Sequence, residues 1–120
     1  MIPPALPHPK PTAQVEPYFE VLGLDDTLRF LEAFGGTEIY IAGNPGTRSS
    51  VVAVVGYDKA KALAEMSHRL QPRVPLAKKW RALAYKAQGL LTVQIARKLC
   101  VTDVAVRNWL RADANKDAAR

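Results

Sequence analysis

The chain has 120 residues and a mass of 13.2 kDa, which limits it to one compact domain or two very small ones and argues against a large catalytic cleft. Its single cysteine excludes an internal disulfide, and with only two histidines beside it no metal-ligand spacing exists, so we expect neither a metal nor another cofactor. No apolar run approaches the ~20 residues of a membrane span and no signal pattern precedes the first helix, so we expect a cytoplasmic protein.

The net charge of +6 is divided unevenly along the chain. Residues 1–68 carry five Lys or Arg against eight Asp or Glu, which gives −3. Residues 69–120 carry twelve Lys or Arg against three Asp, which gives +9 and restores the total of +6. A basic half is typical of a protein that binds the phosphates of nucleic acid, whereas the acidic half should avoid them.

The first half of the chain predicts an arm and one amphipathic helix. Residues 1–17 contain six of the nine prolines and no periodic apolar pattern, so we expect a flexible arm. From Tyr18 to Phe34, apolar residues recur at helical spacing, with Asp25 as the expected N-cap and Gly35 after the last turn. This pattern predicts one helix with a short lead-in.

A short strand is predicted directly after this helix, because residues 37–41 alternate polar and apolar side chains. A lone strand leaves backbone groups unpaired along both edges, and a second copy of the chain is the simplest source of a partner. We therefore expect a homodimer, held together by apolar residues of the helix and the strand: Leu28, Leu31, Phe34, Ile39, Tyr40 and Ile41.

A sequence repeat connects two parts of this first half. The segment 21–25, Val-Leu-Gly-Leu-Asp, recurs thirty-three residues later as Val-Val-Gly-Tyr-Asp at 54–58, and each copy is followed by a helical pattern. The second copy lacks the Gly-Gly pair and the strand, and ends in residues 71–75, which we interpret as a linker. A degenerate duplication and a chance match both remain open.

A scaffold helix is predicted after the linker. Leu76, Trp80, Leu83, Ala84 and Ala87 form one apolar stripe, which ends at a glycine. Two tryptophans, one here and one near the C-terminus at position 109, lie on apolar stripes, which favours core packing over stacking on single-stranded bases.

The segment 92–111 has the pattern of a helix-turn-helix. Thr92 and Thr102 can each cap a short helix, and the small Ala96 allows the two helices to cross closely. Cys100 occupies the turn position that usually favours glycine because φ is positive there, which costs about 1 kcal/mol, and we expect its side chain to be buried. The tail at 112–120 should prolong the last helix or fray.

The second of these helices carries an exposed polar face, opposite Trp109. An Arg can grip guanine through two acceptors and an Asn can pair with the adenine edge, although the same residues could form an ordinary solvated face. We predict that bases are contacted by Thr102, Asp103, Val104, Arg107, Asn108 and Arg111. Phosphates are assigned to Lys78, Lys79, Arg81, Lys86, Thr92, Gln94, Arg97 and Lys98, with Arg73 of the linker as a further candidate for a DNA contact.

Residues 21–41, VLGLDDTLRFLEAFGGTEIYI, followed by a linker, a basic helix ending in Gly89 and a helix-turn-helix with Val101-Thr102, resemble the Mor transcription-activator family of Mu-like phages. The resemblance covers residues 21–111. It implies a dimer with an intertwined N-terminal domain, two DNA-binding lobes, and activation of phage promoters through contact with host RNA polymerase. In that family a Tyr-bearing strand links the two domains and approaches DNA, whereas residues 71–75 here hold two prolines and an arginine.

We therefore expect a mainly α fold, with a dimerisation domain at 18–70 that includes one short strand, a linker at 71–75 and a helix-turn-helix domain at 76–111. The expected function is a transcriptional regulator that binds an inverted-repeat site on double-stranded DNA as a dimer.

Three other classes of function are weighed against this expectation. Catalysis is not expected, because His68, Cys100 and the carboxylates Asp25, Asp26 and Asp58 show no converging pair, and the aspartates are explained as helix caps. A structural DNA-binding protein of packaging or recombination would share the basic half. A protein-interaction module would use the basic helices on an acidic partner.

Overall fold

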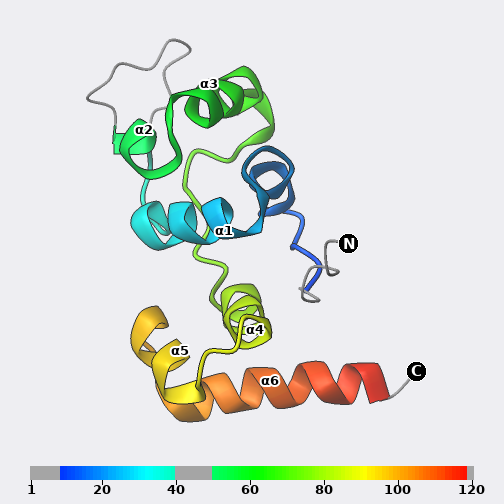
Figure 1. Cartoon of the computed structure of the whole chain (residues 1–120). Coiled ribbons are helices and arrows are strands. Elements are labelled where there is room, and N and C mark those ends of the chain that lie inside the picture. The colour runs from blue at the N-terminus through cyan, green and yellow to red at the C-terminus, as the bar shows by residue number, and fades with distance from the viewer. Residues whose placement is uncertain (1–8, 40–49, 119–120) are drawn as a thin grey trace, which may run out of the picture. The chain divides into compact units, whose positions relative to one another are not determined.

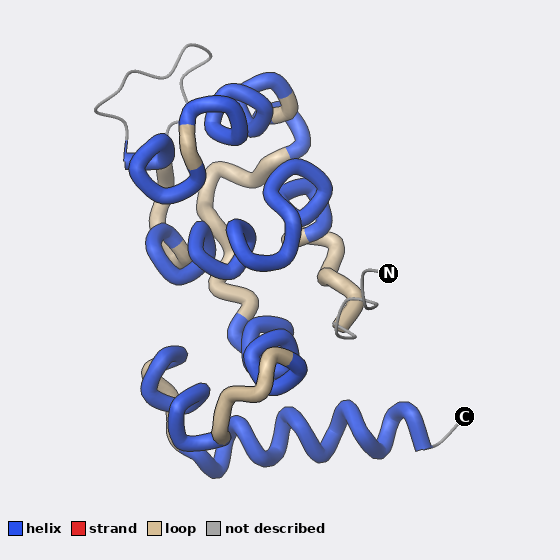
Figure 2. The backbone as a smooth tube through the Cα atoms, in the orientation of Figure 1, coloured by secondary structure: helices blue, strands red, loops and turns tan. Residues whose placement is uncertain are grey.

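The computed structural model describes residues 9–39 and 50–118, and all regular structure in these ranges is helical. Six α-helices and one short 3-10 helix are present there. Figures 1 and 2 show no strand in the described residues. The chain divides into two compact units, which we call unit 1 (residues 1–10 and 78–120) and unit 2 (residues 11–77). The predicted mainly α class is confirmed. No helix in the described ranges is long and apolar enough to cross a membrane.

Unit 2 contains α1 (Glu16–Phe34), α2 (Ser50–Val55), α3 (Tyr57–Glu65) and the 3-10 helix η1 (Ser67–Arg69). The helix α1 starts earlier than the sequence pattern indicated, and Pro17 lies in its first turn, where a missing N–H costs nothing. Residues 12–17, expected in a flexible arm, are ordered around this helix start: Val15 is buried and its N–H donates to the carbonyl of Thr12 at 3.0 Å. Residues 1–8 lie outside the described ranges.

The strand predicted at 37–41 is reduced to a single antiparallel bridge between Glu38 and Arg73. Two hydrogen bonds flank this bridge: the N–H of Gly36 donates to Val74 O at 2.7 Å, and the N–H of Val74 donates to Thr37 O at 2.9 Å. Segment 71–75 of the same chain thus supplies the partner that a second copy was expected to provide. Prolines on both sides of the pair Arg73-Val74 lack the N–H groups that a longer ladder needs. Tyr40 and Ile41 lie outside the described residues.

The sequence repeat of unit 2 is also a repeat of structure. Gly23 (φ 77°, ψ 176°) and Gly56 (φ 88°, ψ 163°) share a backbone conformation that is essentially restricted to glycine, and each joins two helical segments. Gly23 kinks α1, and Gly56 separates α2 from α3. Burial matches position by position from 18–27 to 51–60, except at the residue after each glycine. Each copy therefore comprises a helix, a glycine and a second helix.

The two copies pack against each other. Helix α1 contacts both α2 and α3. Asp26 and Lys59, which occupy equivalent positions thirty-three residues apart, form an ion pair, and the Lys59 ammonium also donates to Leu22 O at 3.2 Å. A contact between equivalent residues is what two copies related by an approximate two-fold axis would make.

The apolar stripe of α1 is already covered within one chain. Leu28 and Leu31 expose only 4% and 1% of their surface, and the ring of Phe30 lies 5.1 Å from that of Tyr18 and 5.0 Å from that of Phe34, measured between centroids. Phe34 and Ile39 are half-buried. The expectation that this stripe needs a second copy for cover is therefore wrong, because α2 and α3 pack on α1.

Unit 1 contains α4 (Lys78–Ala87), α5 (Thr92–Leu99) and α6 (Asp103–Ala118). Figure 1 shows α4 and α5 lying against the N-terminal part of α6, which extends past both. Leu76, predicted on the stripe of α4, is 45% exposed and lies outside the helix, because Ala77, between it and the first residue of α4, has φ 48°. Trp80 is buried as predicted, and its indole N–H donates to Pro9 O at 3.0 Å.

Candidate nucleic-acid interface

Two backbone hydrogen bonds, one across five residues and one across three, end α4 at the turn that leads to α5. The N–H of Leu90 donates to Tyr85 O at 3.1 Å, and the N–H of Gly89 donates to Lys86 O at 2.9 Å. This is the Schellman arrangement, in which the residue after the helix takes positive φ. Gly89 has φ 95°, a value that glycine adopts without strain.

The turn from α5 to α6 repeats the same arrangement with a cysteine. The N–H of Val101 donates to Ala96 O at 3.0 Å, and the N–H of Cys100 donates to Arg97 O at 3.3 Å. Cys100 has φ 57° and ψ 44°, so the left-handed conformation predicted from the sequence is confirmed. Its side chain is exposed, and the expectation of a buried cysteine is wrong, because this position lies beyond the last turn of α5.

Helices α5 and α6 begin with caps of different kinds. Thr102 caps α6 as predicted, because its hydroxyl accepts a hydrogen bond from the N–H of Ala105 at 3.1 Å. Leu91 is the N-cap of α5, and its N–H donates to the side-chain oxygen of Gln94 at 2.8 Å. Thr92, predicted as that cap, is the first helical residue.

The buried side of the two helices matches the predicted packing. Ile95, Ala96 and Leu99 of α5 and Val106 of α6 are buried. Trp109 and Leu110 are half-buried beside Val106. These contacts fix the angle between the helices, so the opposite side of α6 is held as one rigid surface.

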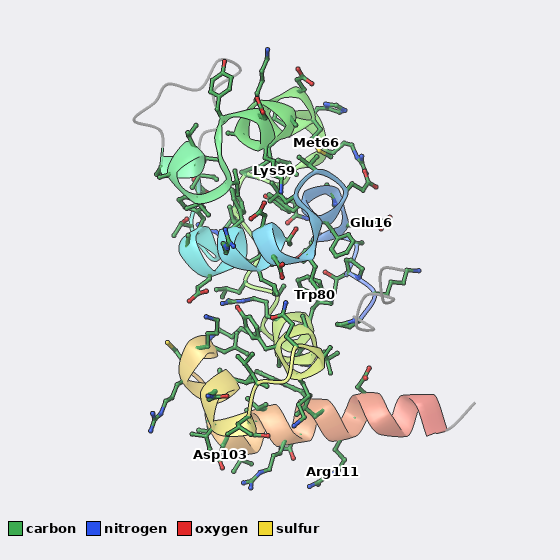
Figure 3. All side chains as sticks on the ribbon, viewed as in Figure 1. Glu16, Lys59, Met66, Trp80, Asp103 and Arg111 are labelled. Carbon is green, nitrogen blue, oxygen red and sulfur yellow. The ribbon has the colours of Figure 1, made fainter. Side chains whose placement is uncertain are left out.

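That opposite side is exposed at every position predicted to contact bases. We call it the α6 face, and it comprises Thr102, Asp103, Val104, Arg107, Asn108 and Arg111. Figure 3 shows Asp103 and Arg111 on the side of α6 that points away from α4. The Arg107 guanidinium lies 3.2 Å from the Asp103 carboxylate, one helical turn earlier.

Most of the residues assigned to phosphates are also accessible. Lys79, Lys86, Gln94, Arg97 and Lys98 are exposed, and Lys78 and Thr92 are half-buried. The Gln94 side chain is already engaged in capping α5, which leaves it less able to hold a phosphate.

Arg81 is the exception, because it is buried with 4% of its surface exposed. Its guanidinium donates to the Tyr85 hydroxyl at 3.4 Å and lies 5.8 Å from the centre of that ring, which also has the Lys98 ammonium 5.4 Å away. Arg81 therefore does not offer its charge to a phosphate. The predicted stripe of α4 omitted Tyr85, and an i, i+4 spacing from Arg81 was the signal that could have shown the pair.

Arg73 stabilises the bridge of unit 2. Its guanidinium donates to Gly36 O at 2.7 Å and lies 3.6 Å from the Glu38 carboxylate. These two contacts give the Arg73 side chain a structural role beside the paired backbone. The sequence-based prediction of a DNA contact at Arg73 did not foresee this role.

The two units differ in charge. By sequence, unit 1 has eleven Lys or Arg against three Asp, which gives +8, and unit 2 has six against eight Asp or Glu, which gives −2, so the sum is +6. Cations of unit 2 pair with its own carboxylates: Arg29 and Lys59 with Asp26, and Arg69 with Glu20. The hydrogen bond from Arg69 lowers the pKa of Glu20. In unit 1, three carboxylates cannot neutralise eleven cations.

Among the described residues, no group of three or more His, Cys, Asp or Glu side chains is placed to hold a metal ion. No family model, curated protein or solved structure matches the chain, so its function has to be inferred from the α6 face and the charge of unit 1.

Proposed function

We propose that the chain is a transcriptional regulator that binds double-stranded DNA sequence-specifically, with α6 as the recognition helix in the major groove. The observation that carries the proposal is the α6 face: five exposed residues of α6 and its exposed cap Thr102, which follow a short turn in a unit of charge +8.

The side chains of the α6 face suit the edges of base pairs. Arg107 and Arg111 carry the forked donors that match guanine N7 and O6, and Asn108 can both donate to and accept from adenine. Val104 is 52% exposed, and an apolar side chain at this position suits contact with a thymine methyl group.

Exposed cations next to this face supply the sequence-independent part of the affinity. Lys79 and Lys86 of α4 and Arg97 and Lys98 of α5 are accessible. Each phosphate that such a cation neutralises releases condensed counterions, which makes binding depend strongly on salt.

The regulatory part of the proposal rests on the resemblance to the Mor family. It supports a homodimer that activates a promoter through contact with host RNA polymerase. Two recognition helices in successive major grooves would read an inverted repeat with half-sites about 34 Å apart. The buried stripe of Leu28 and Leu31 no longer supports the dimer, which makes the symmetry of the footprint decisive. A footprint without two-fold symmetry would mean that the chain binds a single site as a monomer, not an inverted repeat as a dimer.

Selection from a pool of random duplexes, followed by affinity measurements on the selected site, tests the proposal. Arg107→Ala and Asn108→Ala should each cost roughly 1–3 kcal/mol on the selected site and much less on random DNA. Lys61→Ala removes an exposed cation of unit 2 and serves as the control that leaves both affinities unchanged.

Two results would count against the proposal in different ways. Equal losses on selected and random DNA would move Arg107 and Asn108 into the class of phosphate contacts. Failure to bind any duplex at low salt would contradict DNA binding altogether and favour an acidic protein partner.

A further inference from the structure

A carboxylate lies on the surface that we assign to DNA, at the start of α6. Asp103 is one of three acidic residues in unit 1 and lies on the α6 face, where phosphates would repel it. Because this repulsion weakens DNA binding, we expect a contact through which Asp103 improves binding in another way.

The geometry gives Asp103 a partner on the same face. Its carboxylate oxygen Oδ2 lies 3.2 Å from Nη2 of Arg107, and both side chains remain about half exposed, at 50% and 56%. An exposed pair of this kind adds little to folding stability. Its main consequence is therefore where it holds the guanidinium.

An arginine side chain has many rotamers, and each of them can reach a different acceptor on DNA. The carboxylate engages one terminal nitrogen of Arg107 and leaves the remaining N–H donors of the planar group for another acceptor. A guanidinium held by Asp103 has fewer rotamers open to it, and one of its terminal nitrogens is already engaged, so fewer of its conformations place the group against a phosphate.

We infer that Asp103 is a positioning residue that restricts Arg107 to a guanine and keeps it from the phosphate backbone. The inference rests on the proposed function and adds a source of specificity. The Asp103 carboxylate lowers affinity for all DNA, but it lowers affinity for random DNA more than affinity for the selected site, because on random DNA Arg107 would bind phosphates.

Two simpler roles make different predictions. Asp103 is the first residue of α6, where a negative charge stabilises a helix, and loss of that effect would weaken binding to all DNA equally. A carboxylate can also accept from cytosine N4 directly, and its loss would then relax a cytosine preference while the guanine preference of Arg107 stayed intact.

The experiment measures affinity of the full chain for the selected duplex, for duplexes with each single base pair replaced, and for random duplex DNA. Asp103→Ala should reduce the guanine preference at the Arg107 position by roughly two- to fivefold, the range that an exposed ion pair can supply, and should raise affinity for random DNA. Asp103→Asn, which keeps the size but loses the charge, should show the same two changes in weaker form. Asp113→Ala removes an equal charge from the same helix and should leave the guanine preference unchanged.

The double variant separates positioning from the other roles. In an Arg107→Ala background, Asp103→Ala should no longer change the preference at that base pair, because the group it positions is absent. An unchanged guanine preference in Asp103→Ala, or an equal change with and without Arg107, overturns the inference. If the native chain binds no duplex, the proposed function fails first, and the two failures are distinguishable.

Discussion

The two units of this chain use their charged residues in opposite ways. In unit 2, a repeated helix-glycine-helix segment packs on its own copy, and Lys59, Arg69 and Arg73 lie beside carboxylates of the same unit. In unit 1, the supply of carboxylates is too small for the cations, and a row of polar residues on α6 faces outward. The availability of a cation for a ligand thus depends on the acids near it, which the total charge of +6 conceals.

The largest effect that would sharpen this comparison is expected at the two glycines of the repeat. Gly23→Ala and Gly56→Ala should each destabilise unit 2 by roughly 1–3 kcal/mol, because the backbone there strains any residue with a Cβ. Apart from the adjacent residues and the helix's own backbone, no atom lies within 4 Å of either added Cβ, so the cost comes from the backbone conformation and not from a clash with packed side chains. Amide hydrogen exchange should accelerate in α1, α2 and α3 and stay unchanged in α5 and α6.

Equal costs at Gly23 and Gly56 are what a structural repeat requires. Lys61 is an exposed residue of α3, and Lys61→Ala should leave the exchange rates unchanged. This variant is the control for a substitution that does not strain the backbone. If one glycine tolerates alanine and the other does not, the two copies are not equivalent.

Substitutions at the C-terminal ends of α4 and α5 should change the stability of unit 1 by smaller amounts, and the two changes should have opposite signs. Gly89→Ala should destabilise the unit by about 1 kcal/mol, because it places a Cβ at φ 95°. Cys100→Gly should stabilise it by up to about 1 kcal/mol, because it relieves a side chain at φ 57°. Denaturant unfolding measures both, and Cys100→Ser, which keeps the Cβ, should show no gain. A destabilising Cys100→Gly would contradict the strain at this turn.

The smallest effect concerns single surface cations, one from each unit. Arg97→Ala in α5 should reduce the salt dependence of DNA binding by about one phosphate, or ~0.9 in the slope of log affinity against log salt. Lys61→Ala should leave the slope unchanged, although it removes the same charge. Fluorescence anisotropy at several salt concentrations provides the slopes, and equal slopes for both variants would remove the distinction between the units.

Local features of the fold could be predicted from the sequence. The cap at Thr102, the positive φ at Cys100 and the buried Ile95 and Leu99 follow from short-range rules of helix ends and periodicity, and all are confirmed. The exposure of the α6 face follows from the same periodicity. Short-range rules suffice here because the turn joins helices that are adjacent in the chain.

Features that depend on distant residues could not be predicted in this way. Helix α2 spans only Ser50–Val55, too short for a periodic pattern, yet it packs on α1 and its own Val51 and Val55 are buried. The partner of Glu38 comes from a segment thirty-five residues later, and the prolines that shorten their pairing carry no signal until that partner is known. The charge of Arg81 favoured a phosphate contact, and its i, i+4 spacing to Tyr85 is visible in the sequence, but its burial depends on how unit 1 packs around α4.

Chemical-shift mapping of the full chain with its selected duplex tests most directly whether the α6 face binds DNA. The account predicts that the largest amide changes fall between residues 102 and 111, with further changes around Arg97 and Lys98 of α5, and that α1 and α3 remain unperturbed. Changes centred on α1 and α3, or no changes at low salt with DNA in excess, would contradict it.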